Sequence, residues 1–328
     1  MKAGSERHSA CPWEKGPSRP LQRSARRLLF VGAVGLCLGA TSTTASAFCR
    51  SRTCAEQCMF DETTKCPIDG VPIAWTGSCL SYSVQRDGTS SISHADLSAA
   101  TDAAFQTWQG VTCPAANAPP SISIYNLFGI TSCSRVEFNS RQANANIVVL
   151  RDEWEGDASA LGLTTVSLNR DTGQIYDVDI EINGTQPLSV GPLMTNRYDL
   201  ESILTHEVGH FFGIAHSIVG LSGQSCNDGA TMCPYYAPGV GDFRTLDPDD
   251  IAAICAVYPP DRSAGACDPT PHRGFSPECG MDPITGGSCS AAMSSDRPPV
   301  GWMTALVFGC GLAIRQLRLA KRRIQKLT

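Results

Sequence analysis

The sequence predicts a fold of the α+β class, in which several strands and one helix are followed by two further helices. Five short runs of branched or alternating apolar residues are typical of strands; they lie at residues 81–84, 121–125, 146–150, 161–168 and 174–182. Apolar residues recur at helical spacing over residues 95–109, just after the capping candidates Ser93 and His94. A second helix begins near Asp199.

The segment at residues 174–182 alternates most clearly between two strand faces. One predicted face carries Ile175, Asp177, Asp179 and Glu181, and the other carries Tyr176, Val178, Ile180 and Ile182. The three carboxylates of the first face could bind calcium, because calcium prefers several oxygen ligands. A strand face exposed to water is the favoured interpretation of the same residues.

The third predicted helix has strong signals at both ends. Asp247 is the expected N-cap and Pro248 stands at the first helical position. Asp249 and Asp250 follow in the first turn, where the helix dipole favours negative charge. The two prolines at 259–260 are expected to end the helix.

Residues 206–216 contain the pattern H-E-x-x-H-x-x-G-x-x-H. His206 and His210 are four residues apart, so on a helix their imidazoles leave one face and can bind the same metal ion. Gly213 allows a left-handed turn that brings His216 to the same ion. Three protein ligands leave a fourth position open for water, which is the arrangement of a catalytic zinc site.

Glu207 directly follows the first histidine and can act as a general base on a zinc-bound water. The expected reaction is hydrolysis of peptide bonds in a protein or peptide substrate. A different hypothesis is a surface binding or adhesion module that keeps its zinc but no longer cleaves. The presence of Glu207 favours the enzyme, because a binding module has no need of a base at that position.

The two ends of the chain predict export. A basic stretch, an apolar run at residues 28–40 and the sequence Ala45-Ser46-Ala47 are typical of a signal peptide, although an uncleaved anchor would share the first two features. Near the other end, the apolar residues 300–314 are followed by a basic cluster. With the upstream Gly286–Ser290 segment, this end resembles the sorting tails of some bacterial surface proteins, and a plain membrane anchor is the alternative.

These signals divide the chain into five parts. The predicted parts are a signal peptide (1–47), a Cys-rich lead-in (48–70), a zinc metallopeptidase domain (71–260), a stalk rich in Gly, Pro and Cys (261–299) and a transmembrane or sorting tail (300–328). The expected location is the cell envelope or cell surface, or the medium if the protein is released. The oligomeric state does not follow from the sequence.

Cysteine content agrees with export, because an even set of cysteines in an exported chain indicates disulfides. The chain has 16 Cys, and twelve of them remain once the leader, the tail and Cys289 are set aside. Cys226 and Cys233 bracket a loop and are a plausible local pair. The four cysteines at residues 49–66 could instead bind a metal.

The exported part is strongly acidic. Residues 48–285 contain 12 Lys and Arg against 28 Asp and Glu, so the overall formal charge of −5 conceals a much larger local excess. Such a charge disfavours nucleic acid as a partner.

Residues 79–259 resemble the matrixins, which are metallopeptidases of the metzincin group. The resemblance is carried by residues 104–108 (AFQTW), residues 146–149 (NIVV), Asp199 through the histidine motif, Ser217, the segment from Met232 to Tyr236 and residues 249–251. It implies a metzincin-type catalytic domain. Such a domain has a twisted, mostly parallel sheet with an antiparallel edge strand, two long helices, a zinc cleft, a methionine turn and a C-terminal helix.

The same resemblance implies roles for individual residues. The three motif histidines bind zinc, and Glu207 is the base. Met232 forms a floor beneath the metal, while Pro234 and Tyr236 wall the substrate pocket. An extended substrate is expected to add to the edge strand at residues 161–168 as a further strand.

Overall fold

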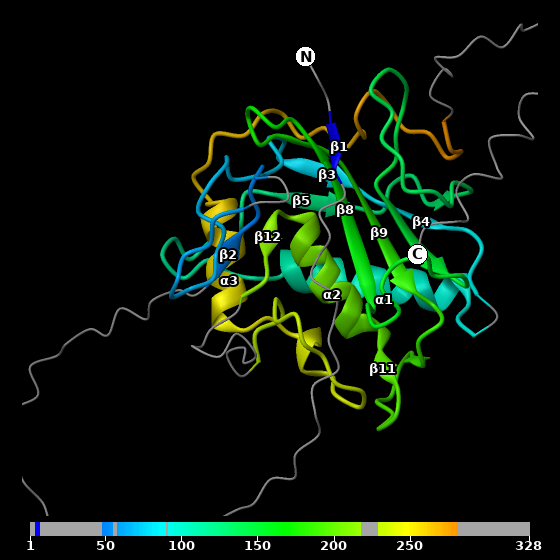
Figure 1. The fold of residues 1–328 in the computed structure, drawn as a ribbon. Coiled ribbons are helices and arrows are strands. Elements are labelled where there is room, and N and C mark those ends of the chain that lie inside the picture. Colours follow the sequence, from blue (N-terminus) through cyan, green and yellow to red (C-terminus); the bar gives the residue numbers. More distant parts are fainter. Residues whose placement is uncertain (1–3, 7–47, 55–57, 90, 218–228, 281–328) are drawn as a thin grey trace, which may run out of the picture. The chain divides into compact units, whose positions relative to one another are not determined.

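The computed structural model describes residues 4–6, 48–54, 58–89, 91–217 and 229–280, all within one unit of the chain, residues 1–283 (Figure 1). Most of the predicted signal peptide, the end of the predicted stalk and the predicted tail lie outside these residues. None of the described helices has both the length and the apolar character needed to cross a lipid bilayer.

The main sheet is mixed and has six strands in the order β1-β8-β9-β7-β4-β6. The strands are β1 (Gly4–Glu6), β4 (Ser83–Gln85), β6 (Ile130–Thr131), β7 (Ile147–Arg151), β8 (Gly162–Leu168) and β9 (Ile175–Asn183). Strands β9, β7, β4 and β6 run parallel, whereas β8 is antiparallel to β9. This confirms the prediction of an α+β fold with a mostly parallel sheet and an antiparallel strand. Because β1 pairs with the second half of β8, at residues 166–168, the prediction of an edge strand holds only for the first half.

Three two-stranded sheets complete the strand content of the described residues. They pair β3 (Cys79–Ser81) with β5 (Ser123–Tyr125), β10 (Leu188–Ser189) with β11 (Tyr198–Asp199), and β2 (Cys49–Arg50) with β12 (Ile214–Ala215). The single strand predicted at residues 81–84 is therefore two strands, separated by Tyr82. The ring of Tyr82 stacks on Phe105 at a centroid distance of 4.1 Å.

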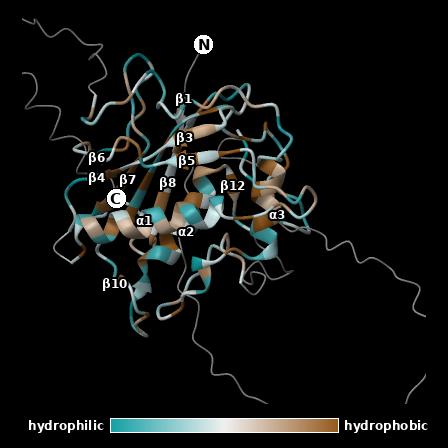
Figure 2. Cartoon of the chain, turned by 180° about the vertical axis from the view of Figure 1, so that it is seen from behind, coloured by the Kyte–Doolittle hydropathy of each residue, from teal (hydrophilic) through white to brown (hydrophobic). Residues whose placement is uncertain are grey.

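Helices α1 (His94–Gln109) and α2 (Leu200–Phe211) pack against each other on one face of the main sheet (Figure 1). The Ser93 side chain caps α1, as predicted, and the helix buries the face with Leu97, Ala100, Ala104, Phe105 and Trp108. Trp108 Nε1 donates a hydrogen bond of 2.7 Å to the carbonyl of Thr205 in α2. The hydrophobic colouring in Figure 2 follows the central strands and the helices beside them, where this core lies.

Helix α3 (Pro248–Val257) packs near β2 and β12. Asp247 is its N-cap and Asp250 closes a capping box, so the predicted start of this helix is confirmed.

The opposite face of the main sheet is covered rather than exposed. Asp177 and Asp179 of β9 are only 1% and 2% exposed. The Asp179 carboxylate accepts hydrogen bonds of 3.0 Å from the backbone N–H groups of Glu137 and Ile147. The interpretation of these residues as a solvated strand face is therefore wrong, because the chain segment before β7 lies over them.

Disulfides connect distant parts of the chain. The five pairs are Cys49–Cys66, Cys54–Cys58, Cys79–Cys267, Cys113–Cys255 and Cys133–Cys279. The alternative of a metal bound by the cysteines at 49–66 is wrong, because all four are oxidised in two of these pairs. Cys233 is also disulfide-bonded, and its predicted partner Cys226 lies outside the described residues.

Part of the predicted stalk is packed onto the domain. Cys267 and Cys279 are bonded to Cys79 and Cys133, and the backbone of Phe275 forms a β-bridge with Asn144. Residues 261–280 are thus attached to the domain rather than forming a free spacer.

Candidate metal centre

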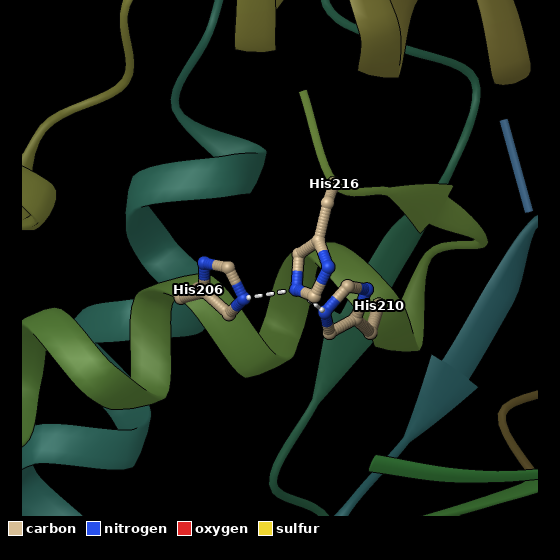
Figure 3. Close-up of side chains that lie close together, drawn as sticks. All are labelled: His206, His210 and His216. Carbon is tan, nitrogen blue, oxygen red and sulfur yellow. Dashed lines mark hydrogen bonds between the residues drawn. The ribbon is translucent and has the colours of Figure 1, made fainter. Parts of the chain in front are cut away.

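Three imidazoles converge at the C-terminal part of α2, as Figure 3 shows. His206 and His210 come from one face of α2, and His216 follows β12. Nε2 of His216 lies 3.1 Å from Nε2 of His206 and 3.1 Å from Nε2 of His210. The turn between helix and strand requires Gly213, whose φ is +83° and where a Cβ would lie 2.7 Å from the carbonyl oxygen of Ile73.

Backbone carbonyls orient two of these rings. Nδ1 of His206 lies 2.6 Å from the carbonyl oxygen of Thr231, and Nδ1 of His210 lies 2.8 Å from that of Ile214. A proton on each Nδ1 satisfies these contacts and leaves the Nε2 lone pair for a metal. Tetrahedral zinc–nitrogen bonds of about 2.0–2.1 Å separate ligand nitrogens by roughly 3.3 Å, which is close to the spacing found here. The donor set therefore fits a zinc ion.

Burial keeps the ligands in the neutral form that binds metal. Desolvation lowers the pKa of His206 and His216 well below the usual range of histidine, and the neighbouring His210 lowers both further. A neutral imidazole has no proton to lose before it binds zinc.

Met232 packs against α2 between two of the histidines. Its side chain is fully buried, and a Cβ at Gly209 would lie 2.1 Å from its sulfur. The Met232 carbonyl accepts a hydrogen bond of 2.9 Å from Ser217 N, directly after His216. The predicted floor residue therefore lies beside the helix that carries the ligands.

The first turn of α3 supports this segment. The Asp250 carboxylate accepts hydrogen bonds from Thr231 N at 2.7 Å and Met232 N at 3.1 Å. Ser217 Oγ donates to Asp249 at 2.9 Å. Because the Thr231 carbonyl orients His206, Asp250 contacts this candidate ligand indirectly, through Thr231.

Pro234 and Tyr236 are both buried. The Tyr236 ring lies 5.0 Å from Phe243 of the 3₁₀ helix η1 (Asp242–Arg244), and the Phe243 ring lies 6.4 Å from that of His206. An aromatic wall thus adjoins the first histidine, where the matrixin resemblance expects a substrate pocket.

The carboxylate of Glu207 is directed towards β8. It is fully buried, and its Oε2 accepts a hydrogen bond of 2.6 Å from Thr164 Oγ1. Gly162 provides the space, since a Cβ there would lie 2.5 Å from Glu207 Oε1. The predicted base therefore adjoins the half of β8 that does not pair with β1.

The predicted calcium ligands do not gather around one point. Among the described residues, the groups of three ligands close enough to share an ion do not include Asp177, Asp179 and Glu181. Glu181 forms an ion pair with Arg151 at 2.6 Å. Glu181 is thus engaged by Arg151 rather than grouped with the two aspartates. Calcium binding by Asp177 and Asp179 stays a prediction.

The sequence indicated no role for Thr164 or Thr231, and it indicated Asp250 only as part of the first turn of its helix and of the matrixin resemblance. Thr164 is 43 residues from its partner Glu207, and the contact depends on how β8 packs on α2. No local pattern in the sequence signals such a contact.

Comparison with known proteins agrees with this geometry. The matrixin family model matches residues 74–259. The chain is 26% identical over 211 residues to Matrix metalloproteinase-C of Caenorhabditis elegans, a match that covers 60% of this chain and 32% of the relative. It is 30% identical over 93 residues to Metalloendoproteinase 1-MMP of Arabidopsis thaliana, covering 28% of this chain and 21% of the relative. The chain thus spans about a third or less of the length of these relatives. Since the family model matches more than half of the chain, this protein belongs to the matrixin family.

Proposed function

We propose that this matrixin is an exported zinc endopeptidase that hydrolyses peptide bonds in protein substrates. The observation that carries the proposal is the convergence of three Nε2 atoms on one point, with Glu207 next to the first of these histidines. The disulfides support export, because such bonds persist mainly in oxidising compartments. The predicted signal peptide and tail would place the protein at the cell envelope or surface, or release it.

His206, His210 and His216 would hold the zinc. The bound ion would supply a Lewis acid that polarises the substrate carbonyl and makes water acidic near neutral pH. Glu207 would accept the proton of the attacking water and deliver it to the nitrogen of the leaving amine. Among the described residues, the backbone edge at residues 162–165 pairs only with β9, so it would bind the substrate as an added strand, and Thr164 of this edge contacts the Glu207 carboxylate.

A casein-cleavage assay on the full chain tests this function. Wild type, Glu207→Ala and His210→Ala are compared, with Glu155→Ala as a control at an exposed glutamate. Glu207→Ala is expected to keep one zinc per chain and lose activity by about 10²- to 10⁴-fold, the usual contribution of a general base. His210→Ala is expected to lose zinc, as measured by elemental analysis.

Two results would contradict the proposal. An inactive wild type that binds zinc would support the binding-module hypothesis instead. Equal activity of wild type and Glu207→Ala would remove Glu207 from the mechanism.

A further inference from the structure

Thr164 of β8 makes a short contact with the candidate base. It is 3% exposed, and its hydroxyl donates a hydrogen bond of 2.6 Å to Glu207 Oε2. The same hydroxyl lies 3.3 Å from the backbone carbonyl oxygen of Glu207. A hydroxyl has one proton, and the contact with Oε2 is much the shorter of the two, so the carboxylate is the main acceptor.

Both ends of this hydrogen bond start from regular structure. Thr164 is paired with Ile180 in the centre of the β8–β9 ladder, and Glu207 lies in the buried middle of α2. The branched side chain of threonine has few χ1 states, so the direction of its hydroxyl is restricted. The bond therefore connects a sheet and a helix through two groups that have little freedom to move.

The neighbouring Thr165 provides an internal comparison. It is also 3% exposed but points to the other face of the sheet, and its Oγ1 has no hydrogen-bond partner within the described part of the chain. This strand therefore accommodates a buried threonine without a hydrogen bond. Burial alone does not account for the contact between Thr164 and Glu207.

We propose that Thr164 is a positioning residue that holds the Glu207 carboxylate in the orientation needed for proton transfer. This inference rests on the proposed function. Burial restricts the Glu207 side chain, and the Thr164 bond fixes the direction of its carboxylate before substrate arrives. Because the proposed substrate edge belongs to the same strand, Thr164 also fixes the position of the Glu207 carboxylate relative to the substrate backbone.

The test compares Thr164→Val, Thr164→Ser and Thr165→Val in the full chain. Valine keeps the shape of threonine without the hydroxyl, and serine keeps the hydroxyl without the methyl group. The measurements are kcat and KM for a peptide that the wild type cleaves, zinc per chain, and the position of Glu207 in crystal structures of wild type and Thr164→Val.

Thr164→Val is expected to lower kcat by about 10- to 100-fold with little change in KM, as expected for a lost hydrogen bond to a charged group. Its zinc content should equal that of wild type, and its Glu207 side chain should occupy more than one rotamer. Thr164→Ser should recover most of the lost kcat. Thr165→Val should behave as wild type.

Three outcomes would overturn the inference: a wild-type kcat for Thr164→Val, an equal loss for Thr164→Ser and Thr164→Val, or an unchanged single Glu207 rotamer in Thr164→Val. The first and third leave the proposed function intact if Glu207→Ala is inactive. An inactive wild type would remove the proposed function and this inference together.

Discussion

At the scale of single residues, backbone groups without charge orient the histidines of the candidate metal centre. The carbonyls of Thr231 and Ile214 each contact one ligand Nδ1. Three neutral imidazoles would leave the full charge of a zinc ion uncompensated apart from Glu207, which favours an acidic bound water. Although the chain is acidic, none of the three candidate ligands is a carboxylate.

The buried acid Asp177 predicts a pH-dependent stability. Burial raises its pKa well above the usual range, and the charges of Asp179 and Glu137 raise it further. A carboxyl whose pKa is raised in the folded state stabilises the fold most below its unfolded pKa of about 3.9, and this stabilisation is lost as pH rises through the folded pKa. Asp177→Asn is therefore expected to melt above wild type at pH 8, with the difference shrinking towards pH 4.

Thermal melts across this pH range check the prediction, with Asp171→Asn as a control at an exposed aspartate in the turn before β9. Asp179 and Glu137 still face the site in the variant, and Arg135 remains 3.3 Å from Glu137. A constant difference between Asp177→Asn and wild type from pH 4 to 8 would show that Asp177 does not titrate differently in the folded state.

At the scale of elements, helix α2 is held at both ends. Asp199 caps its start by accepting a hydrogen bond of 3.0 Å from Ser202 N. At its end, Trp75 Nε1 and the Tyr258 hydroxyl each donate a hydrogen bond of 2.9 Å to the carbonyls of Phe211 and Phe212. Backbone groups that a helix end leaves unsatisfied are thereby paired, which stabilises the helix that carries two of the ligands.

The N-cap of α2 is expected to contribute more to the free energy of unfolding than the N-cap of α1. Asp199 also binds Arg244 through contacts of 2.8 Å and 2.5 Å, whereas the cap Ser93 makes only local bonds. Asp199→Ala should lower the free energy of unfolding by about 2–3 kcal/mol, and Ser93→Ala by about 1 kcal/mol. Urea unfolding measures both, and equal losses would mean that the Arg244 contact adds nothing to the cap.

At the scale of the whole molecule, disulfides attach the chain beyond α3 to earlier parts of the domain: Cys267 to Cys79 of β3, and Cys279 to Cys133 just after β6. Cys133 and Cys279 are 146 residues apart, whereas Cys54 and Cys58 are four apart. In the chain-entropy model, a disulfide that closes a long loop stabilises the folded state by about 4–5 kcal/mol, and a disulfide across a few residues stabilises it by about 2 kcal/mol.

The double variant Cys133→Ser/Cys279→Ser is therefore expected to lose more stability than Cys54→Ser/Cys58→Ser. Thermal melting gives the comparison, and limited proteolysis should cut the first variant within residues 261–280 while leaving wild type intact there. Equal melting temperatures, with no new cleavage, would show that other contacts hold this segment to the domain.

Local signals in the sequence predicted the helices well. Caps and helical spacing placed α1 and α3 closely, because the groups that start a helix are neighbours in sequence. The histidine motif also depends on local spacing, since His206, His210 and the turn at Gly213 need only one helix and its end. The alternation in β9 was predicted, but its carboxylate face was assigned to water because nothing local indicates which segment covers a strand.

The sequence by itself determined the chemistry of the centre: three imidazoles, a carboxylate and a glycine turn within eleven residues. Only the tertiary structure decided what surrounds that centre, including Thr164 on the base, Thr231 on His206, Met232 against Gly209 and the attachment of residues 261–280 to the domain. The physical reason is the separation in sequence of the groups that interact. Helix periodicity and caps act over a few residues, whereas these contacts join side chains and carbonyls that only folding brings within hydrogen-bond or packing distance.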